Sequence, residues 1–349
     1  MVDKLRRAVT VTPATSSRSL GFLGPAGTFT EEALITQDDL AAMHRQPFNS
    51  MLQVLKTVES GRVDLGFVPI ENMIEGAVTS SIDSLAFGTG LLIRREVIMD
   101  VRLKLAALPG TDLDRVKYVR SYPVAYAQCS RFLSRRLPNV VMAAANSTAD
   151  AARDLSASGD LDTVVIAPQR AADVYGLEVV AGDIEDRPGN KTRFVLVGRD
   201  TVPPPTGQDK TSLVVYQRAD APGSLVGILG EFVARSINIT SLQSRPTKSS
   251  LGNYCFLIDC EGHVIDERLG DALRNLQMRA ASVKFLGSYP ADSVSDVIDP
   301  TNRAVRDDID ASYVDDEGYL LLAGVPDRRS RDDADAWLSD VRSKVGRDP

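Results

Sequence analysis

The sequence is poor in the side chains from which metal centres and nucleophilic triads are built. Histidine occurs only twice in 349 residues, at positions 44 and 263, and the three cysteines, at 129, 255 and 260, show no C-x-x-C spacing. A histidine-rich metal site, a Ser/His/Asp triad and a disulfide framework are therefore hard to assemble. We expect chemistry that depends on hydroxyl, amide, carboxylate and guanidinium groups, with no metal and no cofactor.

Long hydrophobic runs are also missing. No stretch approaches the roughly 20 apolar residues that a membrane-spanning helix needs, and residues 1–19 are rich in Ser and Thr without the apolar core of a signal peptide. We interpret residues 1–19 as the flexible leader of a cytoplasmic protein. The 43% hydrophobic and 25% charged residues are typical of soluble globular chains, and the length allows two or three domains.

The net charge of -7 is concentrated near the C-terminus. Residues 291–349 hold 15 acidic and 8 basic residues, whereas residues 1–290 hold 32 of each. A neutral body argues against a nucleic-acid-binding surface, and neither nucleic acid nor a membrane is expected as a partner. We expect residues 291–349 to be an acidic, largely disordered tail with one short helix at 331–345, where Trp337, Leu338 and Val341 lie on one side.

The domain organisation follows from alternating apolar stretches. Residues 20–200 predict an α/β domain with largely parallel sheets, whose strands are expected at 20–24, 64–70, 101–108, 140–144, 163–167 and 192–198, and whose helices are expected at 124–136 and 148–157. Three consecutive prolines mark a linker at 201–210. Residues 211–290 predict a ferredoxin-like βαββαβ domain, with strands at 211–218, 239–245, 253–260 and 282–287 and helices at 223–236 and 266–279.

Two polar motifs follow expected strands near the N-terminus. The first, residues 24–30 (GPAGTFT), is a glycine-rich turn between strand and helix whose free backbone N–H groups would suit an anionic ligand, and Thr28 with Glu31 is expected to form a capping box. An ordinary strand–helix turn is the alternative. In the second, Glu71 and Asn72 follow an apolar strand, where ligands of open α/β sheets bind; alternatively, Asn72 caps the next helix.

Two further motifs lie later in the chain. Ser147 and Thr148 lead into a helix, where they either bind a ligand or simply cap the helix. Arg193 lies in an otherwise apolar strand, TRFVLVG, where a charge is costly unless it is paired. Its partner is expected to be a ligand carboxylate or, as the structural alternative, Glu71 or Asp186.

In this order, the motifs resemble the prephenate dehydratase family. The match covers residues 20–199 and includes its Gly-Pro-x-Gly-Thr-Phe start, its Pro-x-Glu-Asn and Ser-Thr-Ala stretches, Tyr175-Gly176-Leu177 and Thr192-Arg193-Phe194. The second half resembles the ACT domain fused to that enzyme, with matches at residues 222–225 (PGSL) and 243–246 (QSRP).

The resemblance implies a two-lobed catalytic domain, like periplasmic binding proteins, followed by the ACT domain. The implied reaction converts prephenate to phenylpyruvate, carbon dioxide and water in L-phenylalanine biosynthesis. The hydroxyl of Thr192 would assist departure of the ring hydroxyl. The implied substrate-binding set is Gly27, Thr28, Glu71, Asn72, Ser147, Thr148, Arg193 and Phe194.

The ACT resemblance implies feedback by L-phenylalanine, bound between paired ACT domains of a homodimer or homotetramer. The implied effector-binding residues are Gly223, Ser224, Leu225, Gln243, Ser244, Arg245 and Pro246. We expect a separate chorismate mutase to supply the substrate.

Three positions depart from the family pattern: Met73 replaces a Ser, Gln243 replaces a Glu, and Tyr122 replaces a frequent His. Met73 leaves open arogenate dehydration, or decarboxylation of prephenate without aromatisation, although retention of Thr192 argues against the decarboxylase. A non-catalytic amino-acid sensor is the alternative of another class.

Overall fold

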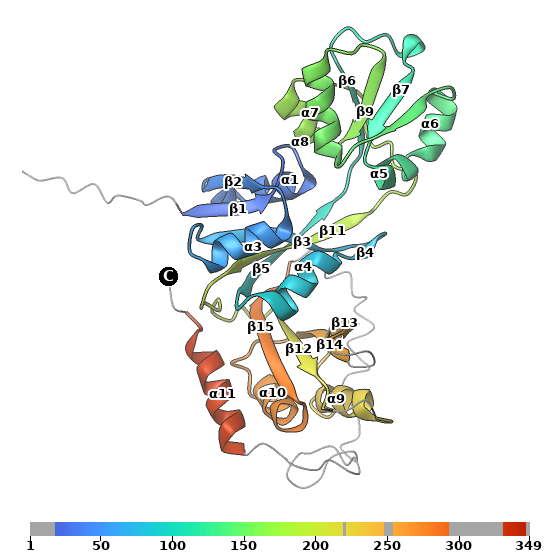
Figure 1. Cartoon of the computed structure of the whole chain (residues 1–349). Coiled ribbons are helices and arrows are strands. Elements are labelled where there is room, and N and C mark those ends of the chain that lie inside the picture. Colours follow the sequence, from blue (N-terminus) through green and yellow to red (C-terminus); the bar gives the residue numbers. More distant parts are fainter. Residues whose placement is uncertain (1–17, 219–220, 248–253, 293–330, 347–349) are drawn as a thin grey trace, which may run out of the picture.

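The computed structural model describes residues 18–218, 221–247, 254–292 and 331–346. The chain forms two lobes and a C-terminal domain, arranged in a row with lobe 1 in the middle (Figure 1). Lobe 1 comprises residues 19–100 and 191–200, lobe 2 comprises residues 101–190, and the C-terminal domain comprises residues 209–290. No helix in these described ranges is long and apolar enough to cross a membrane.

Lobe 1 is built on one mixed sheet. Its strand order is β2 (His44–Phe48), β1 (Ser19–Leu23), β3 (Leu65–Asn72), β11 (Lys191–Gly198) and β5 (Leu92–Asp100), with β4 (Gly76–Ala77) paired to β3. β1 runs parallel to both neighbours, whereas β11 runs antiparallel to β3 and β5. The helical elements are α1 (Phe29–Ile35), α2 (Asp38–Ala41), α3 (Met51–Glu59), α4 (Thr79–Asp83) and the π-helical turn η1 (Ser84–Gly88).

Lobe 2 has a second mixed sheet. Its strand order is β10 (Glu178–Ala181), β6 (Lys104–Ala107), β9 (Thr163–Ala167), β7 (Tyr118–Ser121) and β8 (Val141–Ala144). Every residue of the central strand β9 is buried, as expected for a strand covered on both faces. The surrounding helices are η2 (Leu113–Arg115), α5 (Pro123–Ala127), α6 (Ser130–Arg136), α7 (Thr148–Ser158) and α8 (Gln169–Tyr175).

The chain crosses between the lobes twice, after β5 and before β11. The two crossing segments are hydrogen-bonded to each other: Val101 N donates to Asn190 O at 2.7 Å, and Ile184 N donates to Leu103 O at 3.0 Å. Thr192 is therefore placed directly after the hinge. The prediction that its strand returns to the first lobe and ties Thr192 to the hinge region is confirmed.

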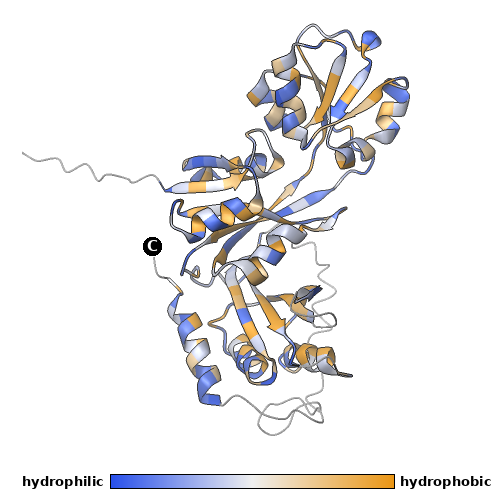
Figure 2. Ribbon diagram, viewed as in Figure 1, coloured by the Kyte–Doolittle hydropathy of each residue, from blue (hydrophilic) through white to orange (hydrophobic). Residues whose placement is uncertain are grey.

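The C-terminal domain has the predicted βαββαβ order. Its elements are β12 (Asp209–Tyr216), α9 (Ser224–Val233), β13 (Ile239–Pro246), β14 (Tyr254–Glu261), α10 (Glu267–Arg279) and β15 (Ser282–Pro290), and the sheet order is β13-β14-β12-β15. Most of β12 is buried, and its hydrophobic residues, 213–215, lie in its second half (Figure 2).

This domain shares a hydrophobic cluster with lobe 1. Val214, Leu286 and Tyr289 pack in the same cluster as Ile93 and Val195. At Gly287, where φ is 142°, a Cβ atom would overlap the carbonyl oxygen of Ile93, so only glycine permits this approach of β15 to β5. Because the contact is close and apolar, displacing the domain from lobe 1 would expose core side chains.

The last described helix, α11 (Arg331–Ser343), packs against α10. Ala334, Leu338 and Val341 are buried, and Arg342 Nε donates to Val264 O at 2.9 Å. The helix expected at 331–345 is thus present. Most of the expected leader and tail, residues 1–17, 293–330 and 347–349, lies outside the described residues.

Some expectations about secondary structure were wrong. The sheets of the two lobes are mixed rather than largely parallel, because the strands next to the hinge run antiparallel to their neighbours as the chain crosses between the lobes. The helix expected at 124–136 is two helices, α5 and α6, which break at Cys129 (φ -115°, ψ 13°). The Asp186 carboxylate accepts from Arg131 N and Ser130 Oγ at the start of α6, and this distant cap is not visible in the local sequence.

Candidate active site

Asn72 and Thr192 meet across neighbouring strands of lobe 1. They are register partners in β3 and β11, and Asn72 Nδ2 donates to Thr192 Oγ1 at 2.8 Å. The amide orientation is fixed, because Asn72 Oδ1 accepts from Ile74 N at 3.0 Å and from Glu75 N at 2.9 Å. Oγ1 of Thr192 therefore acts as an acceptor toward Asn72, and its own proton remains available for donation.

The turn after Asn72 extends toward lobe 2. Met73 is 70% exposed, and its backbone N–H donates to Lys191 O at 2.8 Å. Glu75 Oε1 lies 3.4 Å from Gln128 Nε2 of lobe 2. The Met73 side chain thus stands at the surface beside the Asn72–Thr192 pair, where the family pattern has Ser.

The loop at Gly27 is held by its own helix. Thr28 Oγ1 accepts from Glu31 N at 3.3 Å and donates to Leu23 O at 2.9 Å. The predicted capping box is present in a shifted form, because the Glu31 carboxylate accepts from Gly27 N at 2.6 Å rather than from Thr28 N. The Gly27 N–H therefore already has a hydrogen-bond partner within its own loop.

The same loop contacts lobe 2. Arg170 Nη2 lies 2.9 Å from Glu31 Oε1, and the Tyr175 hydroxyl donates to Ala26 O at 2.9 Å. Burial raises the pKa of the neighbouring Glu32 carboxyl, although a hydrogen bond from the Arg170 backbone opposes this rise. The lobes are therefore in contact on this side of the hinge as well as at Gln128.

In lobe 2, the Ser147 hydroxyl caps α7. It accepts from Asp150 N at 2.9 Å and lies 2.9 Å from Asp150 Oδ2. The capping alternative thus accounts for Ser147 without a ligand. Thr148 is the first residue of α7 and is buried.

Arg193 and Phe194 do not line a pocket beside Thr192. Phe194 is buried and stacks on Phe67, with ring centroids 5.4 Å apart. Successive side chains of a strand point to opposite faces, so Arg193 points away from Thr192. Its guanidinium lies between lobe 1 and the C-terminal domain, and Glu71 lies on the same side, with Oε2 3.9 Å from Arg193 Nη1. Of the expected substrate-binding residues, Arg193, Phe194 and Glu71 therefore lie away from the Asn72–Thr192 pair in this structure, and their substrate-binding roles stay predictions.

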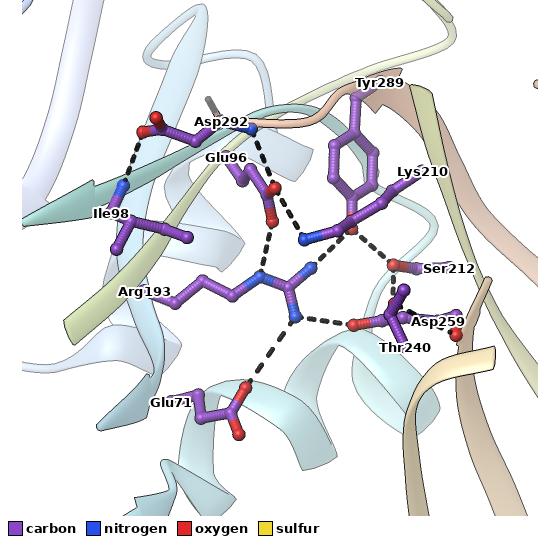
Figure 3. Close-up of polar contacts among 10 residues, drawn as sticks. All are labelled: Glu71, Glu96, Ile98, Arg193, Lys210, Ser212, Thr240, Asp259, Tyr289 and Asp292. Carbon is purple, nitrogen blue, oxygen red and sulfur yellow. Dashed lines mark hydrogen bonds and ion pairs between the residues drawn. The ribbon is translucent and has the colours of Figure 1, made fainter. Parts of the chain in front are cut away.

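Figure 3 shows the partners of Arg193. Nε donates to Glu96 Oε2 at 2.7 Å, Nη1 to Asp259 Oδ2 at 2.5 Å and Nη2 to the Tyr289 hydroxyl at 2.8 Å. The structural ion pair with Glu71, which was the alternative interpretation, is present at 3.9 Å. Glu96 and Asp259 are closer partners that were not expected. Glu96 follows Arg94 and Arg95 in β5, so its burial could not be distinguished in the sequence from that of an exposed charged stretch.

The expected effector residues divide between two faces of the C-terminal domain. Gly223, Ser224, Leu225 and Ser244 line a surface hollow of about 280 Å³, which we call the α9 hollow; its other lining residues are Gln217, Ala221, Val226, Tyr254 and Phe256. Gly223 has a φ of 86°, which favours glycine at the start of α9. Its lining combines apolar side chains, such as Leu225 and Phe256, with polar ones, such as Gln217 and Ser244.

The remaining effector candidates lie outside the α9 hollow. Gln243 lines a small cavity of about 40 Å³ against lobe 1, and Arg245 Nη2 lies 2.8 Å from Asp83 Oδ1 of α4. Pro246 is the exposed last residue of β13. Because strand side chains alternate, Ser244 and Arg245 face opposite sides, so Gln243 and Arg245 lie apart from the α9 hollow and their effector-binding roles stay predictions.

Comparison with known proteins bears on both halves of the chain. Residues 20–202 match the family model for prephenate dehydratase, and residues 211–277 match the model for the ACT domain. A prephenate dehydratase of Mycolicibacterium vanbaalenii is 43% identical over 292 residues, which cover 79% of this chain and 92% of the relative. This chain belongs to the prephenate dehydratase family.

Solved structures agree with this assignment. The prephenate dehydratase of Arthrobacter aurescens in complex with L-Phe is 34% identical, with a TM-score of 0.74 over 93% of this chain and 99% of that one. A structure described as a novel type of quorum quenching acylase is 28% identical, with a TM-score of 0.73 over 80% of this chain and 100% of that one. The fold thus accompanies more than one described activity, and family membership identifies this chain as a prephenate dehydratase, a lyase that decarboxylates and dehydrates its substrate.

Proposed function

We propose that Thr192 is the catalytic residue of this prephenate dehydratase and donates a proton to the departing ring hydroxyl. The observation that carries this proposal is the hydrogen bond from Asn72 Nδ2 to Thr192 Oγ1. Because the amide donates to this oxygen, the Thr192 proton is left to a second acceptor. A leaving hydroxyl group is such an acceptor.

The chemistry suits a weak acid. The C–COO⁻ bond of prephenate breaks to release carbon dioxide, its electron pair enters the ring, and the C–OH bond breaks as the ring becomes aromatic. The hydroxide takes up a proton and leaves as water, so one proton is consumed in each turnover. Thr192 delivers that proton and regains it from solvent. Holding the substrate in one geometry supplies much of the rate enhancement.

Substrate orientation would come from both lobes. We propose that Asn72 and Thr28 contribute from lobe 1, and that Ser147 and Thr148 contribute from the start of α7, where the helix dipole favours a carboxylate. The interlobe contacts from Arg170 and Tyr175 support a closed arrangement. Closure removes water from around the reacting bonds.

We also propose that L-phenylalanine binds in the α9 hollow. The phenyl ring would pack on Leu225, Val226 and Phe256, and Gln217 with Ser244 would bind its polar end. The relative from Arthrobacter aurescens was solved with L-Phe. Apolar side chains beside the hollow, including Val226 at 61% and Leu242 at 42% exposure, would be covered by a second copy in a homodimer or homotetramer. A separate chorismate mutase would supply prephenate.

The test is to incubate the purified chain with prephenate and follow phenylpyruvate by its absorbance in alkali. Turnover that is lost in Thr192→Ala and partly restored in Thr192→Ser would support the proposed acid. Loss of prephenate without phenylpyruvate would indicate decarboxylation alone. If prephenate persists and arogenate is turned over, the substrate would be reassigned to arogenate. If neither compound is turned over, the amino-acid sensor would remain as the interpretation.

A further inference from the structure

Arg193 is adjacent to Thr192 in β11, but its side chain lies on the opposite face of the lobe 1 sheet. The two residues lie in the middle strand of three, so β11 is paired on both sides: Thr192 with Asn72 and Met99, Arg193 with Glu71 and Ile98. The register with β3 shifts immediately after Arg193. Such a bulge re-aims side chains and makes their direction sensitive to the local backbone.

The Arg193 side chain is fixed by groups from two domains. Glu96 belongs to lobe 1, whereas Asp259 and Tyr289 belong to the ACT domain, and each accepts from a different guanidinium nitrogen. Ser212 continues the network, because its Oγ donates to Asp259 Oδ1 at 2.6 Å and lies 2.6 Å from the Tyr289 hydroxyl (Figure 3). The three hydrogen bonds of the guanidinium thus depend on the position of β14 and β15 relative to lobe 1.

The charges in this network lie in a largely buried place. Lys210 Nζ lies 2.8 Å from Glu96 Oε1, so Arg193 and Lys210 face the carboxylates of Glu96 and Asp259, and the more exposed Glu71 carboxylate lies 3.9 Å from Arg193. The side chains of Glu96 and Tyr289 are fully buried, and that of Arg193 is 11% exposed. Removing one partner would leave an uncompensated buried charge, which is costly. The network therefore strongly favours one position of the ACT domain on lobe 1.

The network also reaches the α9 hollow through β14. Tyr254 and Phe256 of this strand line the hollow, and Asp259 lies three residues further along the same strand. A ligand that displaces β14 must therefore displace the Asp259 carboxylate as well, or break its contact with Arg193.

We propose that Arg193 is a positioning residue. Through its hydrogen bonds to Asp259 and Tyr289, the position of the ACT domain on lobe 1 fixes the part of β11 that carries Thr192. The ACT domain thereby sets the rate of dehydration as well as sensing the effector. This inference rests on the proposed roles of Thr192 and of the α9 hollow. Arg193 touches no substrate in this account.

The test uses Asp259→Asn in the full chain, which removes a charge and keeps the side chain's shape. We expect kcat to fall about tenfold with KM within about twofold, since an interaction made by a positioning group affects the reacting geometry rather than substrate binding. Asp335→Asn is the matched control, because it breaks another Arg–Asp pair, with Arg274, between α10 and α11. Tyr289→Phe removes only one hydroxyl and replaces Asp259→Asn if that variant does not fold.

A second measurement is independent of turnover. Hydrogen exchange of the β11 amides should be faster in Asp259→Asn than in the wild type and unchanged in Asp335→Asn. A folded Asp259→Asn with wild-type kcat, or with unchanged β11 exchange, would overturn the inference. Wild-type protein that does not turn over prephenate would instead overturn the proposed function, and the exchange result would still decide the structural coupling.

Discussion

Asn72 donates a hydrogen bond to Thr192 while its amide oxygen is held by two backbone N–H groups. This fixed direction makes Asn72→Asp a sharp test. The carboxylate keeps the acceptor for the turn but cannot donate, so the Thr192 proton would turn toward it and away from the substrate. We expect kcat to fall by about 10²-fold, in the range seen when one oriented donor is removed from an active site.

Asn72→Ala is the comparison for that variant. It removes the donor without adding a competing acceptor, so its kcat should exceed that of Asn72→Asp. The two rates, measured at saturating prephenate, would contradict the assigned hydrogen-bond direction if Asn72→Asp were the faster enzyme.

The ion pair between Arg245 and Asp83 predicts a loss of regulation. Ser244 faces the α9 hollow, and Arg245, the next residue, donates to Asp83 Oδ1 of α4 through Nε at 3.1 Å and through Nη2 at 2.8 Å. In Asp83→Asn, residues 244–245 of β13 should be bound less firmly to α4 of lobe 1. We expect several-fold weaker inhibition by L-phenylalanine at a similar basal kcat. Inhibition curves measured with a range of L-phenylalanine concentrations check this, and an unchanged curve would exclude α4 as a route of regulation.

The close approach at Gly287 predicts a stability effect. Gly287→Ala would place a methyl group against the Ile93 carbonyl and impose an unfavourable φ, which alone costs about 1–3 kcal/mol. We expect a clearly lower Tm by thermal melting. Gly90→Ala is the control, because no atom lies within 4 Å of its added Cβ, and an equal loss in both variants would show that the contact with Ile93 is not responsible.

Glu32 predicts a pH dependence of stability. Burial raises the pKa of its carboxyl from the ordinary value of 4.5. Below pH 4.5 the Glu32 carboxyl is protonated in both the folded and the unfolded chain, so it does not lower the free energy of unfolding. As the pH rises toward the higher pKa of the folded state, the unfolded state ionises first, and the free energy of unfolding falls across that window.

Glu32→Gln should remove this fall and make the protein more stable than the wild type above the window. Urea unfolding at a series of pH values measures the difference. Glu178→Gln, which changes an exposed residue of β10, is the control and should follow the wild type. A fall that persists in Glu32→Gln would assign it to another group.

The sequence predicted the ACT domain almost completely, because its strands and helices are consecutive and each has its own apolar pattern. It also predicted that Asn72 and Thr192 belong to one site. It did not predict β2, whose residues are largely exposed, or β5, where Arg94, Arg95 and Glu96 interrupt the apolar pattern. The direction of the Arg193 and Arg245 side chains depends on how two domains pack, and local patterns carry no information about that packing.

The strand that carries Thr192 lies between β3 and β5, although it follows lobe 2 in the chain. The sheet of lobe 1 is therefore incomplete until lobe 2 has been synthesised, and β3 and β5 lack their common neighbour during that time. Lobe 2 is continuous in sequence and has no such dependence. During synthesis, the chain thus gains the proposed catalytic hydroxyl of Thr192 and completes its central sheet in the same step, so that on this proposal an unfinished lobe 1 would not act on the substrate.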